Sequence, residues 1–250
     1  MYGLEPDGSL VVHADLRHIA EGPVNDMYVD KEGRSYVGHF GFDHHAFLER
    51  HPNMLYAPPG PPRAPIACFS PQGELIGLSE PLAFTNGLFP IDEGRTMLVA
   101  ETLAMRLVAL PVLADGRQGP PRPWPPLDRT LAMEGGHQPR TGRQQHPPHL
   151  RPPGSPGHRR PLQQPHRPGG IAPGNDGMAW VANVPRDECV RVGGPGGTIL
   201  ERVSTSQRTL SCLVAGPKGD TLYAATVRTD DPRRARELNG SRIEAYVLPS

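Results

Sequence analysis

One short pattern recurs along the chain and constrains its fold more than any other feature. A polar turn ends in glycine, and a run of alternating polar and apolar residues follows. Glycine at such a position allows a positive φ, and the alternation suits a half-buried strand. The pattern occurs as EPDGSLVVHA, DKEGRSYVGHF, SPQGELIGL, DEGRTMLVAET, NDGMAWVANV, GPGGTILERV and GPKGDTLYAAT. No long window shows a helical period away from Pro or Gly, so the chain is predicted to be all-β.

These repeats are of two kinds that largely alternate. Runs of the first kind are rich in small and apolar residues and follow Gly33, Gly94, Gly177 and Gly219. Runs of the second kind are more polar and follow Gly8, Gly73 and Gly197. The spacing from Gly177 to Gly219 is 42 residues, the length of one four-stranded propeller blade. The repeats therefore predict a β-propeller, with strands for about four blades.

The segment 117–170 has a different composition, rich in Pro, Arg, Gly and His. It contains fourteen prolines and no valine or isoleucine. Proline removes backbone donors, and apolar side chains are too few to offset chain entropy, so we predict an irregular or disordered segment without strands. A Pro-rich insertion and a GC-rich coding sequence read out of frame are both open as its origin. The segment separates propeller blades at 1–116 from blades at 171–250.

Charge and cysteine content exclude several classes of function. The chain of 250 residues carries 26 basic and 26 acidic side chains, so no net field favours nucleic acid or an anionic membrane. Cys68, Cys189 and Cys212 lack the CxxC spacing of a metal knuckle or redox pair. Neither a signal peptide nor an 18-residue apolar run is present. These features favour a soluble cytoplasmic monomer with a small-molecule partner, without nucleic acid or membrane.

Five motifs together resemble a known family. They are VNDMYVDKEGRSYVGHFGFD, FTNGLFPIDEGRTMLVAET, MRLVALPVLADG, GGIAPGNDGMAWVANV and LSCLVAGPKGDTLYAAT. In this order they are similar to the senescence marker protein, gluconolactonase and luciferin-regenerating enzyme family of six-bladed propellers. The resemblance covers roughly residues 1–116 and 168–250. It implies a metal-dependent hydrolase of sugar lactones or similar cyclic esters.

The resemblance also implies a site at one end of the central channel. A divalent metal, calcium or zinc, would polarise the lactone carbonyl while a carboxylate helps water to attack. Asn86 corresponds to a direct metal-ligand Asn of the family. Asn25 corresponds to the channel Asn that contacts substrate or metal-bound water, so both asparagines are candidate metal residues. We expect Asp26 to be a supporting catalytic carboxylate beside them. Residues just before an inner strand can point into this channel.

Three features of the chain depart from the family's pattern. The chain opens at an outer-strand turn, so we expect the first blade and its metal-binding Glu to be missing, and Glu21 is a poor substitute. Gly169 stands where the family has the Asp of its PDG motif, and Pro23 replaces an Arg found in some relatives. A hard cation held by two neutral amides would bind weakly. The activity of this particular chain is therefore in question.

Several alternatives remain open from the sequence. Asn25-Asp26 could form an Asx-turn, and Asn86-Gly87 is a common turn dipeptide. A zinc site at His44, His45 and His51 is disfavoured because adjacent histidines in a strand point to opposite faces. Glu101 could face the pocket or lie at a solvated blade edge. At the level of the molecule, the main alternative is a non-catalytic or degenerate propeller that acts as a binding module.

Overall fold

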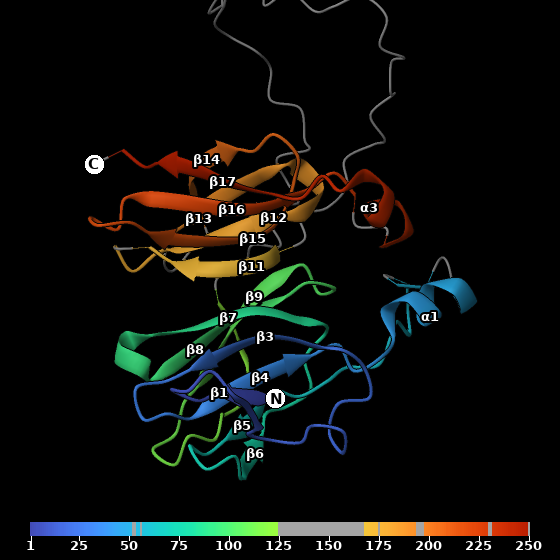
Figure 1. The fold of residues 1–250 in the computed structure, drawn as a ribbon, viewed down its shortest axis with the longest axis vertical. Coiled ribbons are helices and arrows are strands. Elements are labelled where there is room, and N and C mark those ends of the chain that lie inside the picture. Colours follow the sequence, from blue (N-terminus) through green and yellow to red (C-terminus); the bar gives the residue numbers. More distant parts are fainter. Residues whose placement is uncertain are drawn as a thin grey trace, which may run out of the picture.

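The structure of the chain is a computed structural model. It describes residues 1–51, 54–55, 57–124, 168–174, 176–193, 198–229 and 232–249. Four antiparallel sheets follow one another in chain order, and each is built from consecutive strands (Figure 1). We name these sheets the first to fourth blades. The four-bladed, all-β arrangement confirms the propeller prediction at that level.

The blades differ little in size. The first blade contains β3 (Val24–Val29), β4 (Ser35–His39), β5 (Ala67–Phe69) and β6 (Leu75–Leu78). The second contains β7 (Thr85–Ile91), β8 (Thr96–Glu101), β9 (Arg106–Pro111) and β10 (Arg122–Trp124). The third contains β11 (Pro168–Pro173), β12 (Ala179–Asn183), β13 (Glu188–Val192) and β14 (Ile199–Ser204). The fourth contains β15 (Arg208–Ala215), β16 (Thr221–Val227) and β17 (Arg242–Val247).

The remaining elements lie outside these sheets. A two-stranded hairpin precedes the first blade and consists of β1 (Tyr2–Leu4) and β2 (Leu10–Val12). The helices among the described residues are α1 (His44–Arg50), α3 (Pro232–Leu238) and the 3-10 turns η1 (Asp92–Gly94) and η2 (Val184–Arg186). Short helices at α1 and α3 were not predicted, because seven residues are too few to show a helical period. Within the described residues, no helix has the length and apolarity that a membrane span requires.

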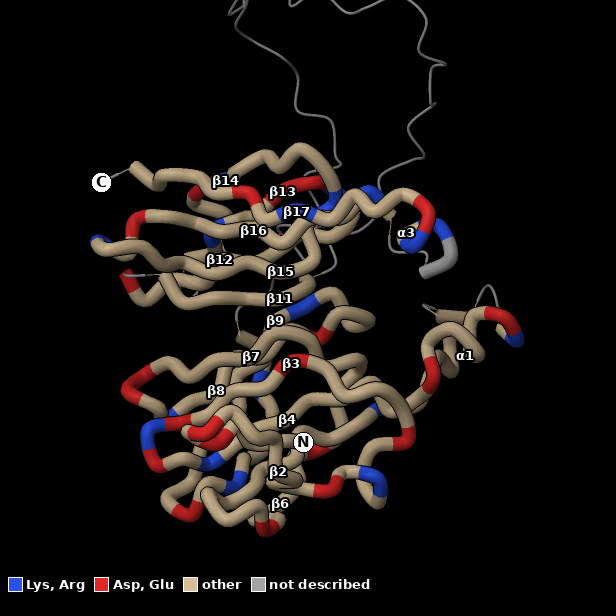
Figure 2. Tube along the Cα trace, viewed as in Figure 1, with Lys and Arg blue, Asp and Glu red and all other residues tan. Residues whose placement is uncertain are grey.

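The first strand of each blade lies innermost. Contacts join β3 to β7, β7 to β11, and β11 to β15, so the inner strands form a continuous row. Apolar clusters fill the space between neighbouring blades, for example Tyr36 with Met97 and Val108, and Ala182 with Leu222. On the other face of the first blade, Val37 packs against Ala14 and Leu16 from the N-terminal segment. Charged residues of both signs lie mostly in the turns (Figure 2).

The two kinds of glycine turn have distinct places in this architecture. Turns of the first kind join the first and second strands of a blade. Of the second kind, the turn at Gly73 joins the outer strands β5 and β6, and the turn at Gly8 joins the two strands of the N-terminal hairpin. Each described glycine of the pattern has a positive φ: Gly8, Gly33, Gly73, Gly94, Gly177 and Gly219. Gly197 lies outside the described residues. In the first blade, the alternation seen in the sequence therefore reflects the alternation of an inner hairpin at Gly33 and an outer hairpin at Gly73.

The prediction that 117–170 contains no strand is wrong at both ends. Strand β10 (Arg122–Trp124) pairs with β9, and β11 begins at Pro168. Proline is tolerated in these places because β10 is an edge strand and Pro168 is the first residue of its strand. The rest of the predicted irregular segment, 125–167, lies outside the described residues.

Candidate functional site

A β-bulge interrupts every inner strand near its first residues. The pairing register shifts between Val24 and Met27 in β3, and between Thr85 and Leu88 in β7. The same shift occurs at the start of β11 and of β15. Bulges re-aim side chains and locally end regular pairing. The residues inside these four bulges therefore occupy equivalent positions, all at the end of the blades where α1 and α3 lie (Figure 1).

The sequence-predicted site residues are these bulge residues. Asn25 and Asp26 lie in the bulge of β3, and Asn86 lies with Gly87 in the bulge of β7. Both pairs belong to strands, so the alternative of simple turns is wrong. The third bulge contains Gly169, and the structure thus places it at the position equivalent to Asn25 and Asn86.

Side-chain hydrogen bonds join the bulges across three blades. Asn25 Nδ2 donates to the carbonyl oxygen of Thr85 at 3.0 Å, which brings Asn25 beside the residue that precedes Asn86. Asn86 Nδ2 donates to Thr102 Oγ1 at 3.2 Å. Thr102 Oγ1 in turn donates to the carbonyl oxygen of Pro168 at 2.7 Å. The two asparagines are therefore held at one end of the inner strands by bonds that also connect the blades.

Gly87 is required by the close approach of two blades. A Cβ at this position would lie 2.2 Å from the backbone nitrogen of Ile171 in β11. No side chain fits at that distance, so Gly87 allows β7 and β11 to pack closely. Its backbone N–H donates to Asn86 Oδ1 at 3.1 Å, which fixes the asparagine side chain.

Asp26 is the ionisable group of the site. The side chain is half-buried, and burial raises the pKa of its carboxyl above the usual range. Among the described residues it has no hydrogen-bond partner. A half-buried carboxylate without a partner is a candidate for binding a cation, substrate or water.

These side chains match a hard divalent cation in kind but are few in number. Amide and carboxylate oxygens are the ligands that Ca²⁺ prefers, and Asn25, Asn86 and Asp26 offer both types. Gly169 contributes no ligand. Nowhere in the described part of the chain do three or more His, Cys, Asp or Glu side chains form a metal-binding cluster. The donor set therefore suits a weak calcium site with several positions left to water.

A second set of equivalent polar residues was not predicted. Its members lie at the last or penultimate position of the second strand of each blade and pair with the residue at which the bulge begins. They are between 0 and 2 % exposed: His39, Glu101, Asn183 and Thr226. The sequence does contain a signal for this set. Each apolar run of the first kind, YVGHF, MLVAE, AWVAN and LYAAT, contains one polar residue at or near its end.

Glu101 shows what this second set does for the site. Its carboxylate is fully buried, bonds Arg106 Nε at 2.5 Å, and accepts from the backbone N–H of Ala83 at 2.8 Å. Both possibilities considered for Glu101, facing the pocket and lying at a solvated blade edge, are therefore wrong. The residue anchors the loop that leads to Thr85 and Asn86. At the equivalent place in the first blade, burial lowers the pKa of His39, partly offset by Glu21.

The histidine group lies in a helix and not in a strand. His44 and His45 belong to α1, and Asp43 caps this helix by accepting from the backbone N–H groups of His45 and Ala46. His51 follows the last helical turn. No metal cluster forms from these residues within the described chain.

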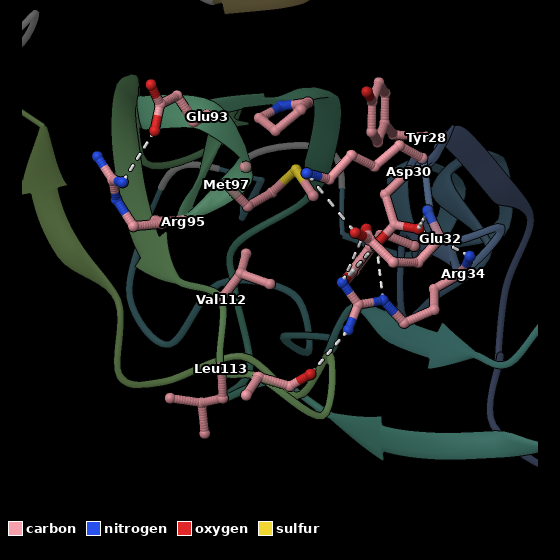
Figure 3. Close-up of a pocket in the computed structure, with 14 residues that line it drawn as sticks. Tyr28, Asp30, Glu32, Arg34, Glu93, Arg95, Met97, Val112 and Leu113 are labelled. Atoms are coloured by element: carbon pink, nitrogen blue, oxygen red, sulfur yellow. Dashed lines mark hydrogen bonds and ion pairs between the residues drawn. The ribbon is translucent and has the colours of Figure 1, made fainter.

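A cavity of about 740 Å³ lies at the opposite end of the first two blades (Figure 3). Its walls come from the β3–β4 and β7–β8 turns, with Met97 and Val112 as apolar lining. Arg34 bonds Asp30 at 2.7 Å, and Arg95 bonds Glu93 at 3.0 Å. None of the sequence-predicted site residues lines this cavity. The charged side chains of this cavity form ion pairs with one another, so it offers no chemistry comparable to that of the bulges.

Comparison with known proteins identifies the relatives of this arrangement. A family model described as the SMP-30/gluconolactonase/LRE-like region matches residues 4–228. No curated protein matches the chain in sequence.

Three solved structures illustrate the likeness in fold. One is a luciferin-regenerating enzyme, which is 17% identical and has a TM-score of 0.61. The match covers 90% of this chain and 61% of the enzyme's chain. The calcium-binding protein regucalcin from Agrobacterium tumefaciens is 15% identical with a TM-score of 0.62, covering 96% and 66%. A gluconolactonase from Xanthomonas campestris is 14% identical with a TM-score of 0.58, covering 91% and 62%. The chain thus spans less than two thirds of the length of these structures.

Proposed function

Because the chain belongs to the SMP-30/gluconolactonase/LRE-like family, we propose that it is a hydrolase of sugar lactones or similar cyclic esters. The observation that carries this proposal is the meeting of the bulges of β3 and β7, where Asn25 donates to the Thr85 carbonyl next to Asn86. The names of two neighbours in fold, a gluconolactonase and a calcium-binding protein, support it. We further propose that the blades are of the six-bladed type.

The proposed reaction uses few groups. Water attacks the lactone carbonyl carbon, the bond between this carbon and the ring oxygen breaks, and the ring oxygen takes a proton from the protonated Asp26 and leaves as a hydroxyl. Asp26 accepts the proton from the attacking water, and its raised pKa brings it nearer to the range of an effective general base. Asn25, whose Nδ2 is committed to Thr85, retains its Oδ1 as an acceptor for a substrate hydroxyl.

We propose a divalent cation, calcium or zinc, as cofactor, with calcium favoured by the all-oxygen donor set. Asn86, Asn25 and Asp26 would hold it. When bound, the cation would act as a Lewis acid toward the carbonyl oxygen. With so few protein ligands, its affinity should fall in the weak class of calcium sites, about 10⁻⁴–10⁻³ M.

Lactone hydrolysis followed by pH-stat tests the proposal. The wild type should open glucono-δ-lactone or another lactone faster in millimolar calcium than in chelator. Asp26→Asn should lower the rate by about 100-fold, the typical loss on removing a general base. Glu93→Gln, in an exposed turn at the other end of the blades, is the control and should leave the rate unchanged. Equal rates in all three proteins would overturn the proposal.

A binding module is the second candidate, and Gly169 favours it. The third bulge carries no side chain, so a group that the resemblance assigns to catalysis is missing at that position. A module of this kind would bind the lactone without turnover. Saturable binding of glucono-δ-lactone with no hydrolysis above the spontaneous rate would support it.

A further inference from the structure

An aromatic pair lies next to the candidate site and has no part in the function described so far. Phe40 and Phe84 stack with ring centroids 3.9 Å apart and an interplanar angle of 17°. We propose that this pair is an apolar wall that selects lactones or esters with an apolar or aromatic substituent over polyhydroxylated ones. This proposal rests on the proposed function, which supplies the lactone or ester group of the substrate.

Backbone hydrogen bonds tie both rings to the strands of the site. The Phe40 N–H donates to the carbonyl oxygen of Pro23 at 3.1 Å, two residues before Asn25. The carbonyl oxygen of Phe84 accepts from the Thr102 N–H at 3.1 Å, and Thr102 Oγ1 is the acceptor for Asn86. Phe40 is thus bonded to the residue two positions before Asn25, and Phe84 itself lies two positions before Asn86. Both aromatic residues are therefore close to an asparagine of the site.

Burial distinguishes this pair from core phenylalanines. Phe69 and Phe89 are almost completely buried, as expected for residues that only fill a core. Phe40 and Phe84 are half-buried despite their mutual stacking. Each residue of the pair thus remains partly accessible to a ligand at the end of the inner strands.

The backbone at Phe84 is strained. Its φ is 62°, in the left-handed region that bulky residues rarely adopt. Three hydrogen bonds hold the loop in this conformation. The Ala83 N–H donates to the buried Glu101 carboxylate, the Thr102 N–H donates to the Phe84 carbonyl oxygen, and the Leu103 N–H donates to the Ala83 carbonyl oxygen. Strain of this kind costs free energy and persists where surrounding structure enforces it, often at binding sites. A structural role alone would be served as well by glycine at this position.

The neighbours of the pair extend its aromatic character. Phe42 lies 6.0 Å and His44 5.8 Å from Phe84 between ring centroids, and Phe47 contacts Phe42 edge-on at 5.3 Å. A polyhydroxylated ring needs polar partners for its hydroxyl groups, whereas an apolar substituent needs a dry, polarisable surface. The cluster provides the second kind of surface on the side of the first and second blades.

The test compares three lactones: γ-butyrolactone, γ-phenyl-γ-butyrolactone and glucono-δ-lactone. The wild type should favour the phenyl compound, and Phe84→Gly should lower its kcat/KM relative to that of γ-butyrolactone by about tenfold. Glycine removes the ring and suits the positive φ, so the variant should keep its fold. Phe84→Tyr retains the ring and should retain the preference. Tyr2→Ala removes an exposed ring in the β1–β2 hairpin and should not change the ratio.

Binding of non-hydrolysable lactams separates this inference from the proposed function. Wild-type protein should bind 5-phenyl-2-pyrrolidinone more tightly than gluconolactam in saturation-transfer NMR, and Phe84→Gly should lose that difference. This result without hydrolysis of any lactone would sustain the aromatic wall and overturn the hydrolase. Hydrolysis with a ratio that Phe84→Gly leaves unchanged would sustain the hydrolase and overturn the wall. Neither selective binding nor turnover would overturn both.

Discussion

The side chains at the end of the inner strands have structural as well as chemical roles. Thr102 accepts from Asn86 and donates to the Pro168 carbonyl, so one hydroxyl links a site residue of the second blade to the third blade. Glu101, the preceding residue, holds the loop before β7. Thr102 and Glu101, which are not among the predicted site residues, therefore position the site.

Replacing Thr102 tests this positioning role. Thr102→Val keeps the shape of the side chain but removes the hydroxyl, leaving the Asn86 amide without its partner. We expect a loss of about 1 kcal/mol in the free energy of unfolding, because a half-buried polar group is left unpaired. Thr102→Ser keeps the hydroxyl and should lose less. Urea denaturation of the three proteins measures the difference, and equal stability of the Val and Ser variants would contradict the role.

Removing the Glu101 side chain should lower the free energy of unfolding more than removing the Thr102 hydroxyl. Glu101→Ala leaves the Ala83 N–H and the half-buried Arg106 without their partner, and breaking a buried pair in this way typically costs about 3–5 kcal/mol. Glu101→Gln preserves the shape and the acceptor for Ala83, so its loss should be smaller. Thermal and urea unfolding measure both variants. A Glu101→Ala protein as stable as the wild type would show that the network does not hold the loop.

At the scale of elements, the inner strands pack more tightly than their sequence suggests. A Cβ on Gly169 would lie 2.4 Å from the carbonyl oxygen of Leu210 in β15. Restoring the family's carboxylate by Gly169→Asp should therefore destabilise the protein, by about 1–3 kcal/mol as for other overpacked sites. Calcium affinity and unfolding should be measured together on this variant. Unchanged stability with tighter calcium binding would contradict the close packing of β11 and β15.

The fourth blade has an acid-sensitive element at Glu244 in β17. Burial acts to raise the pKa of this carboxyl, but hydrogen bonds from Ser206, Tyr246 and Thr226 outweigh it and lower the pKa to about 2. Because the folded pKa is lower than the unfolded value, the ionised form stabilises the fold above about pH 4.3. This contribution is lost as the pH falls from about 4.3 to about 2.

Glu244→Gln should reveal this contribution. At pH 7 the variant should be less stable than the wild type, and the difference should disappear near pH 2. Urea midpoints at pH 7, 4, 3 and 2 measure it. A difference that is the same at every pH would show that the carboxylate charge has no part in joining β15, β16 and β17.

The strands could be predicted because their signals are local. A glycine with positive φ and an alternating run lie within ten residues of each other, and the pattern correctly placed β4, β8, β12 and β16. The contacts of the site are long-range: Asn25 meets Thr85 sixty residues away, and Thr102 meets Pro168 across the Pro-rich segment. No local pattern specifies such pairs, so the contacts of Glu101 and Thr102 were not predictable, although the polar residue at the end of MLVAE is a signal for Glu101 itself. The aromatic pair, from the ends of two different blades, was missed for the same reason.

At the scale of the whole molecule, the two ends of the row of blades differ. Residues of the N-terminal segment cover the first blade, with Ala14 and Leu16 buried against Val37. On the fourth blade, Leu213, Ile243 and Val247 are 56–81 % exposed. The chain spans 61–66% of the structures it resembles. The candidate site lies where the inner strands of the first and second blades begin.

Calorimetric titration with calcium tests the central claim, that the bulges of β3 and β7 form one binding site. The wild type should bind one calcium ion weakly, with Kd about 10⁻⁴–10⁻³ M, and Asn86→Ala and Asp26→Asn should each abolish detectable binding. Glu93→Gln, at the other end of the blades, should bind like the wild type. Binding that survives both site substitutions, or is lost only in Glu93→Gln, would place the cation elsewhere and contradict the account.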